Sequence, residues 1–265
     1  MNGNPQLLAT LKQLHVSGIM DTLDLRAQQA ADERLSFPEF LERVMQDELE
    51  RRMTKQLALR VRRANFQSDK TLQTFDFAFN PTVNRQQIIE LAGAGFVERK
   101  QNILITGPSG VGKSHLAHAL GWEACKRGYE VLCSSCAKLL VSLAAGRADG
   151  SYQRRIQAIL RPDLLILDDF GLKPLRPPAP EDFYDIINER YDKPKSAIIL
   201  TSNRALSEFP QLFGDPLLAS AGLDRLFDNT IAITLTGASF RARNRSKLLA
   251  PTVPKSSKKA GDPID

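Results

Sequence analysis

Residues 1–65 carry leucine and methionine side chains at helical spacings, separated by polar residues. Four leucines share one helical face and predict a first amphipathic helix: Leu7, Leu8, Leu11 and Leu14. We expect Gly18 to end this helix, because glycine often follows a helical C-terminus. A second helix is predicted from about Met20 to Ala31.

A longer helix is predicted to begin after Ser36. The sequence Ser36-Phe-Pro-Glu39 supplies an N-cap hydroxyl, an early proline and the glutamate of a capping box. Six apolar residues then recur at every fourth position: Leu41, Met45, Leu49, Met53, Leu57 and Val61. Such a stripe packs against a core or a partner surface. We therefore predict a small all-α N-terminal domain over residues 1–66, which binds DNA or a partner.

From residue 81 onward, short apolar runs alternate with helical segments. The expected strands are 103–105, 130–135, 164–170, 197–203 and 230–235. The expected helices include a segment ending near 94, one that follows the first strand, 138–145, 152–160, 181–191 and 216–226. This alternation predicts an α/β fold, in which a parallel sheet is covered by helices on both faces. We assign it residues 81–238, with a linker over 67–80 and a C-terminal tail over 239–265.

A glycine-rich turn lies between the first predicted strand and its helix. It reads GPSGVGKS and fits the pattern GxxxxGK[ST], whose backbone N–H groups surround the phosphates of a nucleoside triphosphate. Lys113 is expected to reach the β- and γ-phosphates, and the Ser114 hydroxyl to bind Mg²⁺. The predicted nucleotide-binding residues are Gly107, Pro108, Ser109, Gly110, Val111, Gly112, Lys113, Ser114 and His115.

Two later strands end in polar residues. The apolar run 164–167 is followed by Asp168 and Asp169, as in a Walker B strand. We predict that Asp168 holds Mg²⁺, directly or through water, and that Asp169 polarises the attacking water. Asn203, preferred here over Thr201, is expected to orient that water. A carboxylate pair in this place could instead cap a helix or form an ion pair.

Phosphoryl transfer requires one more cation near the γ-phosphate, because catalysis depends on charge stabilisation. Arg225, in the sequence GLDRL, is the best candidate, as a finger supplied to a neighbouring subunit. Arg204 and Arg190 are the next candidates. The alternative interpretation of Arg225 is a surface arginine without a catalytic role.

The composition is that of a globular protein, with 42% apolar and 25% charged residues. The apolar runs are far shorter than the ~20 residues of a membrane span, and the N-terminus shows no signal pattern, so we expect a cytoplasmic protein without membrane contact. Cys133 and Cys136 have no second pair to complete a zinc site, so we interpret them as small buried residues.

The net charge of +6 is concentrated in two segments. Seven basic residues and no acidic one lie between Arg241 and Lys259. The second half of the long helix is also basic, with Glu48 and Glu50 as its nearest acidic residues. Both segments are candidates for DNA phosphate contacts, and a solvated charged face is the alternative for the helix. The predicted DNA-binding residues are Arg51, Arg52, Lys55, Arg62, Arg63, Arg241, Arg243 and Arg245.

The predicted linker ends in Phe75-Asp-Phe-Ala-Phe79, with aromatic residues at alternate positions. One hypothesis places this segment across the base of the bound nucleotide. The other, which the alternating pattern favours, makes it a plug at the edge of the sheet.

The motifs GPSGVGKS, LLILDDFG, ILTSN and GLDRL, in this order, resemble those of AAA+ ATPases of the initiator and helicase-loader group. Within that group the chain resembles the IstB family, the helper ATPases of bacterial insertion sequences, which are similar to the DnaC helicase loader. The segments ERRMTKQLALRVRRANF and TGASFRAR also resemble this family, so the similarity covers nearly the whole chain.

The resemblance implies a P-loop AAA+ ATPase with ATP and Mg²⁺ as cofactors, in which hydrolysis to ADP and phosphate acts as an assembly switch. It implies a homo-oligomer with the nucleotide between subunits, where Arg225 of one subunit faces Lys113 and Asp169 of the next. It further implies assembly on duplex DNA, remodelling of that DNA, and recruitment and activation of the transposase of the same mobile element.

Two departures from the AAA+ pattern bear on the mechanism. Few residues follow the last strand, so the usual helical lid looks absent or truncated, and Arg241 is the one candidate for an arginine that senses nucleotide from it. Asp169 stands where many AAA+ proteins have glutamate, which suits a switch better than a motor.

Three other functions are compatible with these motifs. A DnaC-like loader would engage a replicative helicase through the N-terminal helices and prefer single-stranded DNA. A small-molecule P-loop kinase also fits the glycine-rich turn, but two basic segments argue against it because a metabolite enzyme has no use for them. A DNA-coating protein would bind ATP without hydrolysing it.

Overall fold

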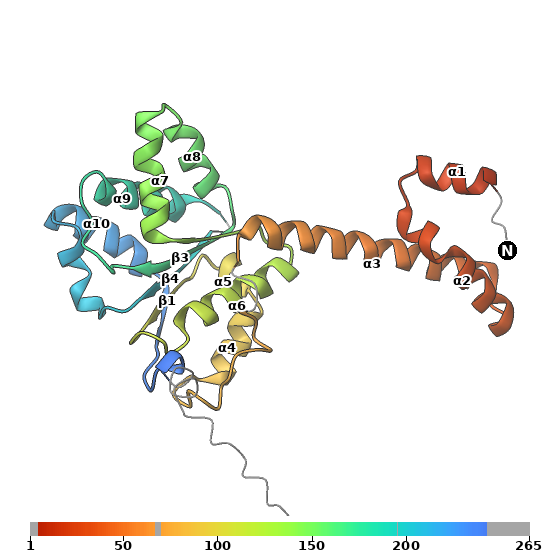
Figure 1. Cartoon of the computed structure of the whole chain (residues 1–265), viewed down its shortest axis with the longest axis horizontal. Helices are drawn as coiled ribbons and strands as arrows, with labels where there is room; N and C mark the ends of the chain where they lie inside the picture. The colour runs from red at the N-terminus through yellow and green to blue at the C-terminus, as the bar shows by residue number, and fades with distance from the viewer. Residues whose placement is uncertain (1–4, 67–69, 195, 243–265) are drawn as a thin grey trace, which may run out of the picture.

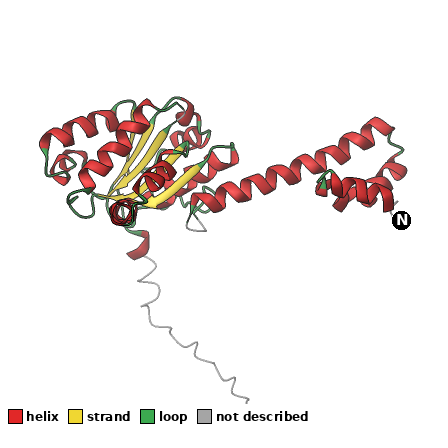
Figure 2. Cartoon of the chain, turned by 90° about the horizontal axis from the view of Figure 1, so that it is seen from above, coloured by secondary structure: helices red, strands yellow, loops and turns green. Residues whose placement is uncertain are grey.

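A computed structural model describes residues 5–66, 70–194 and 196–242. It contains a five-stranded sheet in the order β2-β3-β4-β1-β5, and all neighbouring strands are parallel. The strands are β1 (Asn102–Thr106), β2 (Val131–Ser135), β3 (Leu164–Phe170), β4 (Ala197–Ser202) and β5 (Thr230–Thr234). The predicted α/β fold, with helices on both faces of a parallel sheet, is confirmed (Figures 1 and 2).

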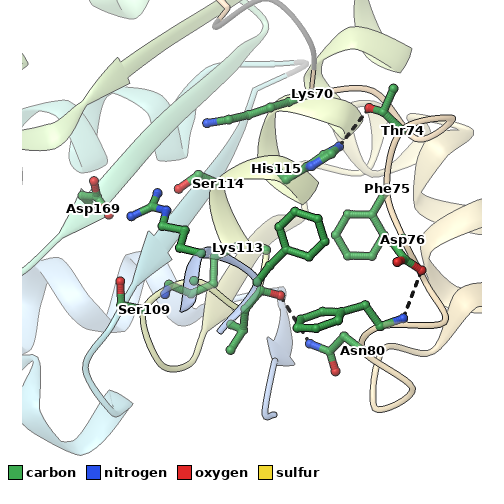
Figure 3. A pocket seen from close by; sticks show the side chains of 16 residues that line it. Lys70, Thr74, Phe75, Asp76, Asn80, Ser109, Lys113, Ser114, His115 and Asp169 are labelled. Carbon is green, nitrogen blue, oxygen red and sulfur yellow. Dashed lines mark hydrogen bonds between the residues drawn. The ribbon is translucent and has the colours of Figure 1, made fainter. Parts of the chain in front are cut away.

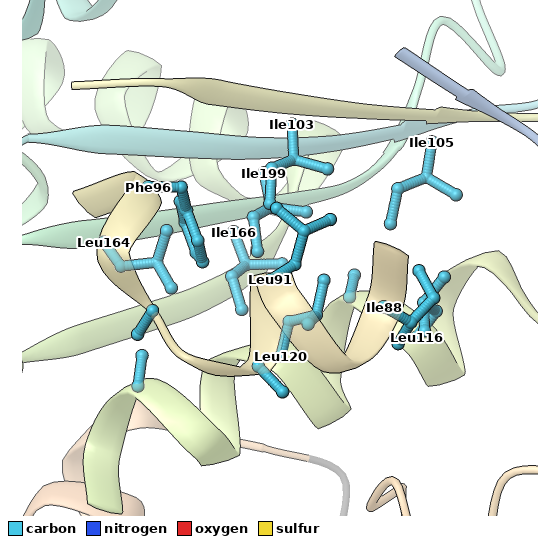
Figure 4. Packing of buried hydrophobic residues seen from close by; sticks show 14 of the residues in the cluster. Ile88, Leu91, Phe96, Ile103, Ile105, Leu116, Leu120, Leu164, Ile166 and Ile199 are labelled. Carbon is cyan, nitrogen blue, oxygen red and sulfur yellow. The ribbon is translucent and has the colours of Figure 1, made fainter. Parts of the chain in front are cut away.

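Two layers of helices cover the sheet, because successive residues of a strand point to opposite faces. Ile103 and Ile105 of β1 belong to one apolar cluster, whereas Leu104 between them belongs to the other. Figure 4 shows the first cluster, which α4 (Arg85–Ala92), α5 (Gly95–Glu98) and α6 (Lys113–Lys126) cover. The second is covered by α7 (Cys136–Ala148), α8 (Tyr152–Leu160), α9 (Ala179–Asp192) and α10 (Pro216–Phe227).

Most predicted elements match the structure to within a few residues. The bounds of α8 and β3 are as predicted, while α7 begins two residues before Lys138. Short 3₁₀ helices at Leu206–Glu208 and Pro210–Leu212 fill the connection between β4 and α10 and were not predicted. All three cysteines are buried, as we expected of Cys133 and Cys136. Among the helices that the structure describes, none is long and apolar enough to cross a membrane.

The N-terminal region is helical, as predicted, and consists of α1 (Pro5–Gln13), α2 (Ser17–Glu33) and α3 (Phe37–Ala64). The prediction that Gly18 ends a helix was wrong: the chain reverses at His15, which adopts a φ of 56°, and Gly18 lies in the first turn of α2. Its amide donates to Glu48 Oε2 at 2.6 Å. A Cβ at Gly18 would lie 2.8 Å from the Glu48 Cα, so glycine here permits close helix packing.

The helix α3 begins with the predicted capping box at Ser36 and Glu39. It extends from the part of the chain that contains the sheet to α1 and α2 (Figure 1). Its apolar stripe has two different environments. Leu57 and Val61 pack against the core cluster, whereas the first four members are about half exposed or more: Leu41 (53%), Met45 (50%), Leu49 (54%) and Met53 (64%). The stripe is therefore core packing at one end and an open surface at the other.

Candidate nucleotide-binding site

The glycine-rich turn connects the carboxyl end of β1 to α6. Gly107, Gly110 and Gly112 all have positive φ values, of 143°, 86° and 105°. A Cβ at Gly107 would overlap the carbonyl oxygen of Leu235, and one at Gly110 would overlap the Ser239 hydroxyl. The turn therefore requires glycine for its backbone angles and for its contact with the segment after β5.

Lys113 is the first residue of α6, and only 5% of its surface is exposed. Its Nζ donates to the carbonyl oxygen of Pro108 at 2.7 Å, within the same turn. Burial lowers the pKa of the ammonium group, and the charge of Asp169 acts in the opposite direction. The lysine is thus held within the glycine-rich turn and under the charge of Asp169.

The Ser114 hydroxyl donates to Asp168 Oδ1 at 2.8 Å, so the two predicted metal ligands lie in contact. The Thr201 hydroxyl also donates to Asp168 Oδ1 and accepts the amide N–H of Asp169 at 3.0 Å. Hydroxyl and carboxylate oxygens are the ligands that Mg²⁺ prefers. The residues present therefore fit a Mg²⁺ ion held between α6 and β3.

Asp169 adopts a φ of 58°, which turns its side chain out of the pleat of β3 and into the cavity beside the glycine-rich turn. Burial and the charge of Asp168 raise the pKa of its carboxyl group, while Lys113 and Arg241 oppose the rise. A carboxylate held in this way can accept a proton from a water molecule.

The cavity has a volume of about 280 Å³ and is lined from four parts of the chain (Figure 3). The glycine-rich turn and the start of α6 form one wall, Asp169 another, and residues from the linker and the segment after β5 close the rest. The linker residues are Lys70, Thr74, Phe75, Asp76, Phe79 and Asn80, and the last segment provides Phe240 and Arg241.

The aromatic linker residues pack in the core and also line the cavity. Phe75 is 9% exposed and belongs to the core cluster, yet it also lines the cavity. Its ring lies 5.2 Å from the His115 ring, centroid to centroid, and a Cβ on Gly112 would lie 3.0 Å from it. Phe79 packs edge to face on Phe240 at 5.2 Å. The segment is therefore part of the core and a wall of the cavity.

A family model described as "IstB-like ATP binding protein" matches residues 9–248. The chain belongs to this family. It is 36% identical to a protein of Pseudomonas aeruginosa named as an ATP-binding protein of insertion sequence IS21, over 91% of this chain and 89% of the relative. It is 37% identical to an insertion-sequence ATP-binding protein of Mycobacterium tuberculosis, over 91% and 96%.

Solved structures show that this family member has an AAA+ fold. The crystal structure of the DnaC helicase loader superposes with a TM-score of 0.55 at 22% identity, over 63% of this chain and 97% of that one. AMPPCP-bound DnaA from Aquifex aeolicus gives 0.53 at 24%, over 72% and 59%. The chain is therefore a member of an ATP-binding protein family with an AAA+ fold, and the predicted family and fold class are confirmed.

The structure separates the two candidate residues at the end of β4. Thr201 lies within the strand and contacts Asp168, whereas Asn203 is exposed just past the strand end. Asn203 is not among the described residues that line the cavity. In this conformation Thr201, not the preferred Asn203, is the polar residue beside the carboxylates.

The three candidate arginines have different surroundings. Arg225 lies in the last turn of α10, at the amino end of the sheet, where its Nη1 donates to the Tyr184 hydroxyl at 3.0 Å. It borders a second cavity of about 300 Å³. Arg190 is 3% exposed and donates to five backbone carbonyls, so it is structural in this family member. Arg204 donates to Gly171 O and pairs with Glu208 at 3.1 Å.

The predicted DNA contacts fall in three places. On α3, Arg51 pairs with Asp21, Arg52 with Glu48 and Arg63 with Glu130, and Lys55 and Arg62 are also exposed. Arg241 lines the nucleotide cavity. Arg243, Arg245 and any lid that follows them lie outside the described residues. The predicted DNA contacts of this family member remain predictions.

Sequence reasoning missed the cavity residues Lys70, Asn80 and Phe240. Asn80 donates to the carbonyl oxygen of Val111 at 3.3 Å, and the Phe240 amide donates to that of Gly110 at 3.0 Å. These contacts connect residues far apart in the sequence, so no local pattern specifies them. The aromatic run 75–79 was the only local signal.

Proposed function

We propose that this protein is an ATP-dependent, DNA-binding regulator of transposition, which oligomerises on duplex target DNA, remodels it, and recruits and activates the transposase of the same mobile element. The observation that carries the proposal is a nucleotide site with paired Ser114 and Asp168 in a chain whose relatives are insertion-sequence ATP-binding proteins. The proposed cofactors are ATP and Mg²⁺.

The proposed reaction is hydrolysis of ATP to ADP and phosphate. When bound, Mg²⁺ neutralises charge on the β- and γ-phosphates, and Ser114 and Asp168 would hold it. Lys113 leaves its contact with Pro108 O to bind phosphate oxygens. Asp169 accepts a proton from the attacking water. The Thr201 hydroxyl bonds the Asp168 carboxylate but only the backbone amide of Asp169, so the Asp169 carboxylate stays available for this proton.

Arg225 is proposed to act on the nucleotide of a neighbouring subunit. It precedes β5 at the amino end of the sheet, whereas the glycine-rich turn follows the carboxyl end of the parallel strand β1, so Arg225 is remote from its own site. Tyr184 holds the guanidinium at a part-exposed position, with the ring centroid 5.6 Å from the Arg225 Cζ. A head-to-tail assembly would bring this charge to the next subunit's phosphates.

Mixing two inactive variants tests this arrangement. We expect Arg225→Ala alone to lose about a hundredfold or more in ATP hydrolysis, because a transition-state cation is removed. An equal mixture with Lys113→Ala should recover part of the turnover on duplex DNA, since an intact site meets an intact arginine wherever the two variants are neighbours. A mixture of Lys113→Ala with Asp169→Asn is the control and should stay inactive, because both changes damage the same site. An inactive Arg225→Ala mixture would contradict action between subunits.

The exposed basic residues of α3 and the basic tail are proposed to contact DNA phosphates. Figure 2 shows that α3 extends away from the sheet and its covering helices. These basic side chains of α3 are exposed, so a large ligand can reach them. Phosphate contacts need no base-reading element and make binding dependent on salt. The exposed apolar residues between Leu41 and Met53 offer the same helix a second surface, suited to a protein partner.

Sedimentation and electron microscopy with DNA of about fifty bases test the proposal as a whole. We expect large assemblies on the duplex in ATP and not in ADP, and weaker binding to the matching single strand. Preference for the single strand would favour a helicase loader instead. No binding to either DNA would contradict both functions and reopen the metabolite-kinase hypothesis.

A further inference from the structure

The nucleotide cavity contains a lysine outside the glycine-rich turn. Lys70 comes from the linker that follows α3 and lines the cavity together with Lys113, Ser114 and Asp169. In Figure 3 its side chain extends over the first turn of α6, toward the side where Ser114 and Asp169 lie, while Asp76 and Asn80 lie on the other side. Ser114 and Asp169 mark the end of the site where the terminal phosphate must lie.

The position of Lys70 is fixed by its neighbours on α6. The carbonyl oxygen of Thr71 lies 2.9 Å from His115 Nε2, and the Thr74 hydroxyl lies 3.3 Å from the same nitrogen. Thr71 and Thr74 also hydrogen-bond each other, which makes a closed turn. His115 therefore fastens this turn to the helix that carries Lys113 and Ser114, and Lys70 directly precedes it.

The electrostatic surroundings agree with this position. Burial, followed by the charge of Lys70, lowers the pKa of the His118 imidazole to about 4. The charge of Lys70 also opposes the rise in the pKa of Asp169 that burial and Asp168 cause. Lys70 thus acts on both α6 and the end of β3 from within the same cavity.

We propose that Lys70 binds the γ-phosphate of ATP in the same subunit and so distinguishes ATP from ADP. Lys113 contacts the β-phosphate as well and serves both nucleotides, whereas Lys70 extends toward Ser114 and Asp169, the end of the cavity that the γ-phosphate of ATP occupies and ADP leaves unfilled. This inference rests on the ATP binding of the proposed function. Phe66, two residues after the end of α3, packs on His118 and Trp122 of α6. Lys70 therefore lies close to the C-terminal end of α3.

Titration of the full chain with AMPPCP and with ADP, both with Mg²⁺, tests this role. For Lys70→Met, which keeps the apolar stem and removes the charge, we expect AMPPCP affinity to fall about tenfold to a hundredfold, as for a lost charge-assisted hydrogen bond. ADP affinity should stay within about threefold. Lys70→Arg should retain most of the difference between the two nucleotides, and Lys138→Ala, an exposed lysine on α7, should change neither affinity.

Equal losses for both nucleotides, or no loss, would overturn the assignment of Lys70 to the γ-phosphate. Thermal unfolding without nucleotide checks that each variant folds, and Lys70→Gln replaces Lys70→Met if that variant does not. Failure of the unchanged protein to bind either nucleotide would overturn the proposed function and this inference with it. A normal ATP preference in Lys70→Met would overturn this inference alone.

Discussion

Lys113→Ala should lower the affinity for ATP by about a hundredfold or more. The buried ammonium group is expected to contact two phosphates, and each charge-assisted contact contributes about tenfold to a hundredfold in affinity. ADP binding should fall as well, since the β-phosphate is common to both nucleotides. Alanine is a good helix former, so the start of α6 should persist. Equilibrium titration with both nucleotides measures the loss, and sedimentation with duplex DNA shows whether ATP-dependent assembly is lost with it.

Lys126→Ala is the matched control for that loss. Lys126 is the last residue of the same helix and pairs with Glu123 at 2.8 Å, away from the cavity. Its removal should leave nucleotide affinity unchanged. Near-normal ATP affinity in Lys113→Ala would contradict the assignment of the glycine-rich turn as the phosphate site.

Asp169→Asn should lose ATP hydrolysis by about a hundredfold to ten-thousandfold while retaining ATP binding. Hydrolysis is lost because the amide cannot accept the proton of the attacking water. ATP binding is retained because the change removes a negative charge beside the phosphates. Asparagine also tolerates the left-handed backbone that Asp169 adopts, so the local structure should be kept. Steady-state phosphate release and nucleotide titration separate the two effects.

Asp168→Asn serves as the contrasting variant. Asp168 accepts hydrogen bonds from Ser114 and Thr201 and is the proposed Mg²⁺ ligand, so its change should weaken Mg²⁺-dependent binding as well as turnover. If Asp169→Asn still assembles on duplex DNA in ATP, hydrolysis serves to reset the assembly. Unchanged turnover in Asp169→Asn would rule out its role as base, and absence of turnover in the unaltered protein would favour a coating function.

The parts of the fold and site that sequence predicted are those with local signals. The strand 164–170 is a continuous apolar run that ends in carboxylates, and its bounds match the structure. The glycine-rich turn is a contiguous motif, so all of its residues were found together. By contrast, the cavity walls at Lys70 and Phe240 depend on contacts between distant segments, which periodicity and spacing do not specify.

One wrong prediction, at Gly18, and the unexpected position of Asn203 have simple physical causes. Position 18 requires glycine because Glu48 packs against its backbone. A glycine required by packing looks the same in sequence as one that ends a helix. Thr201 and Asn203 would share one side of a continuing strand, but β4 ends at Ser202, so Asn203 leaves the pleat. Sequence also could not show that four of the six stripe residues of α3 are uncovered, because periodicity identifies a face and not what lies on it.

The 28 residues of α3 form one unbroken helix, so at 1.5 Å per residue it is about 42 Å long. One end packs on the ATPase core and the other carries α1 and α2. A rotation of only about 10° at the packed end would therefore displace the far end by about 7 Å, given that length. The helix can act as a lever, which converts a small rotation beside the nucleotide into a movement large enough to engage or release a bound macromolecule.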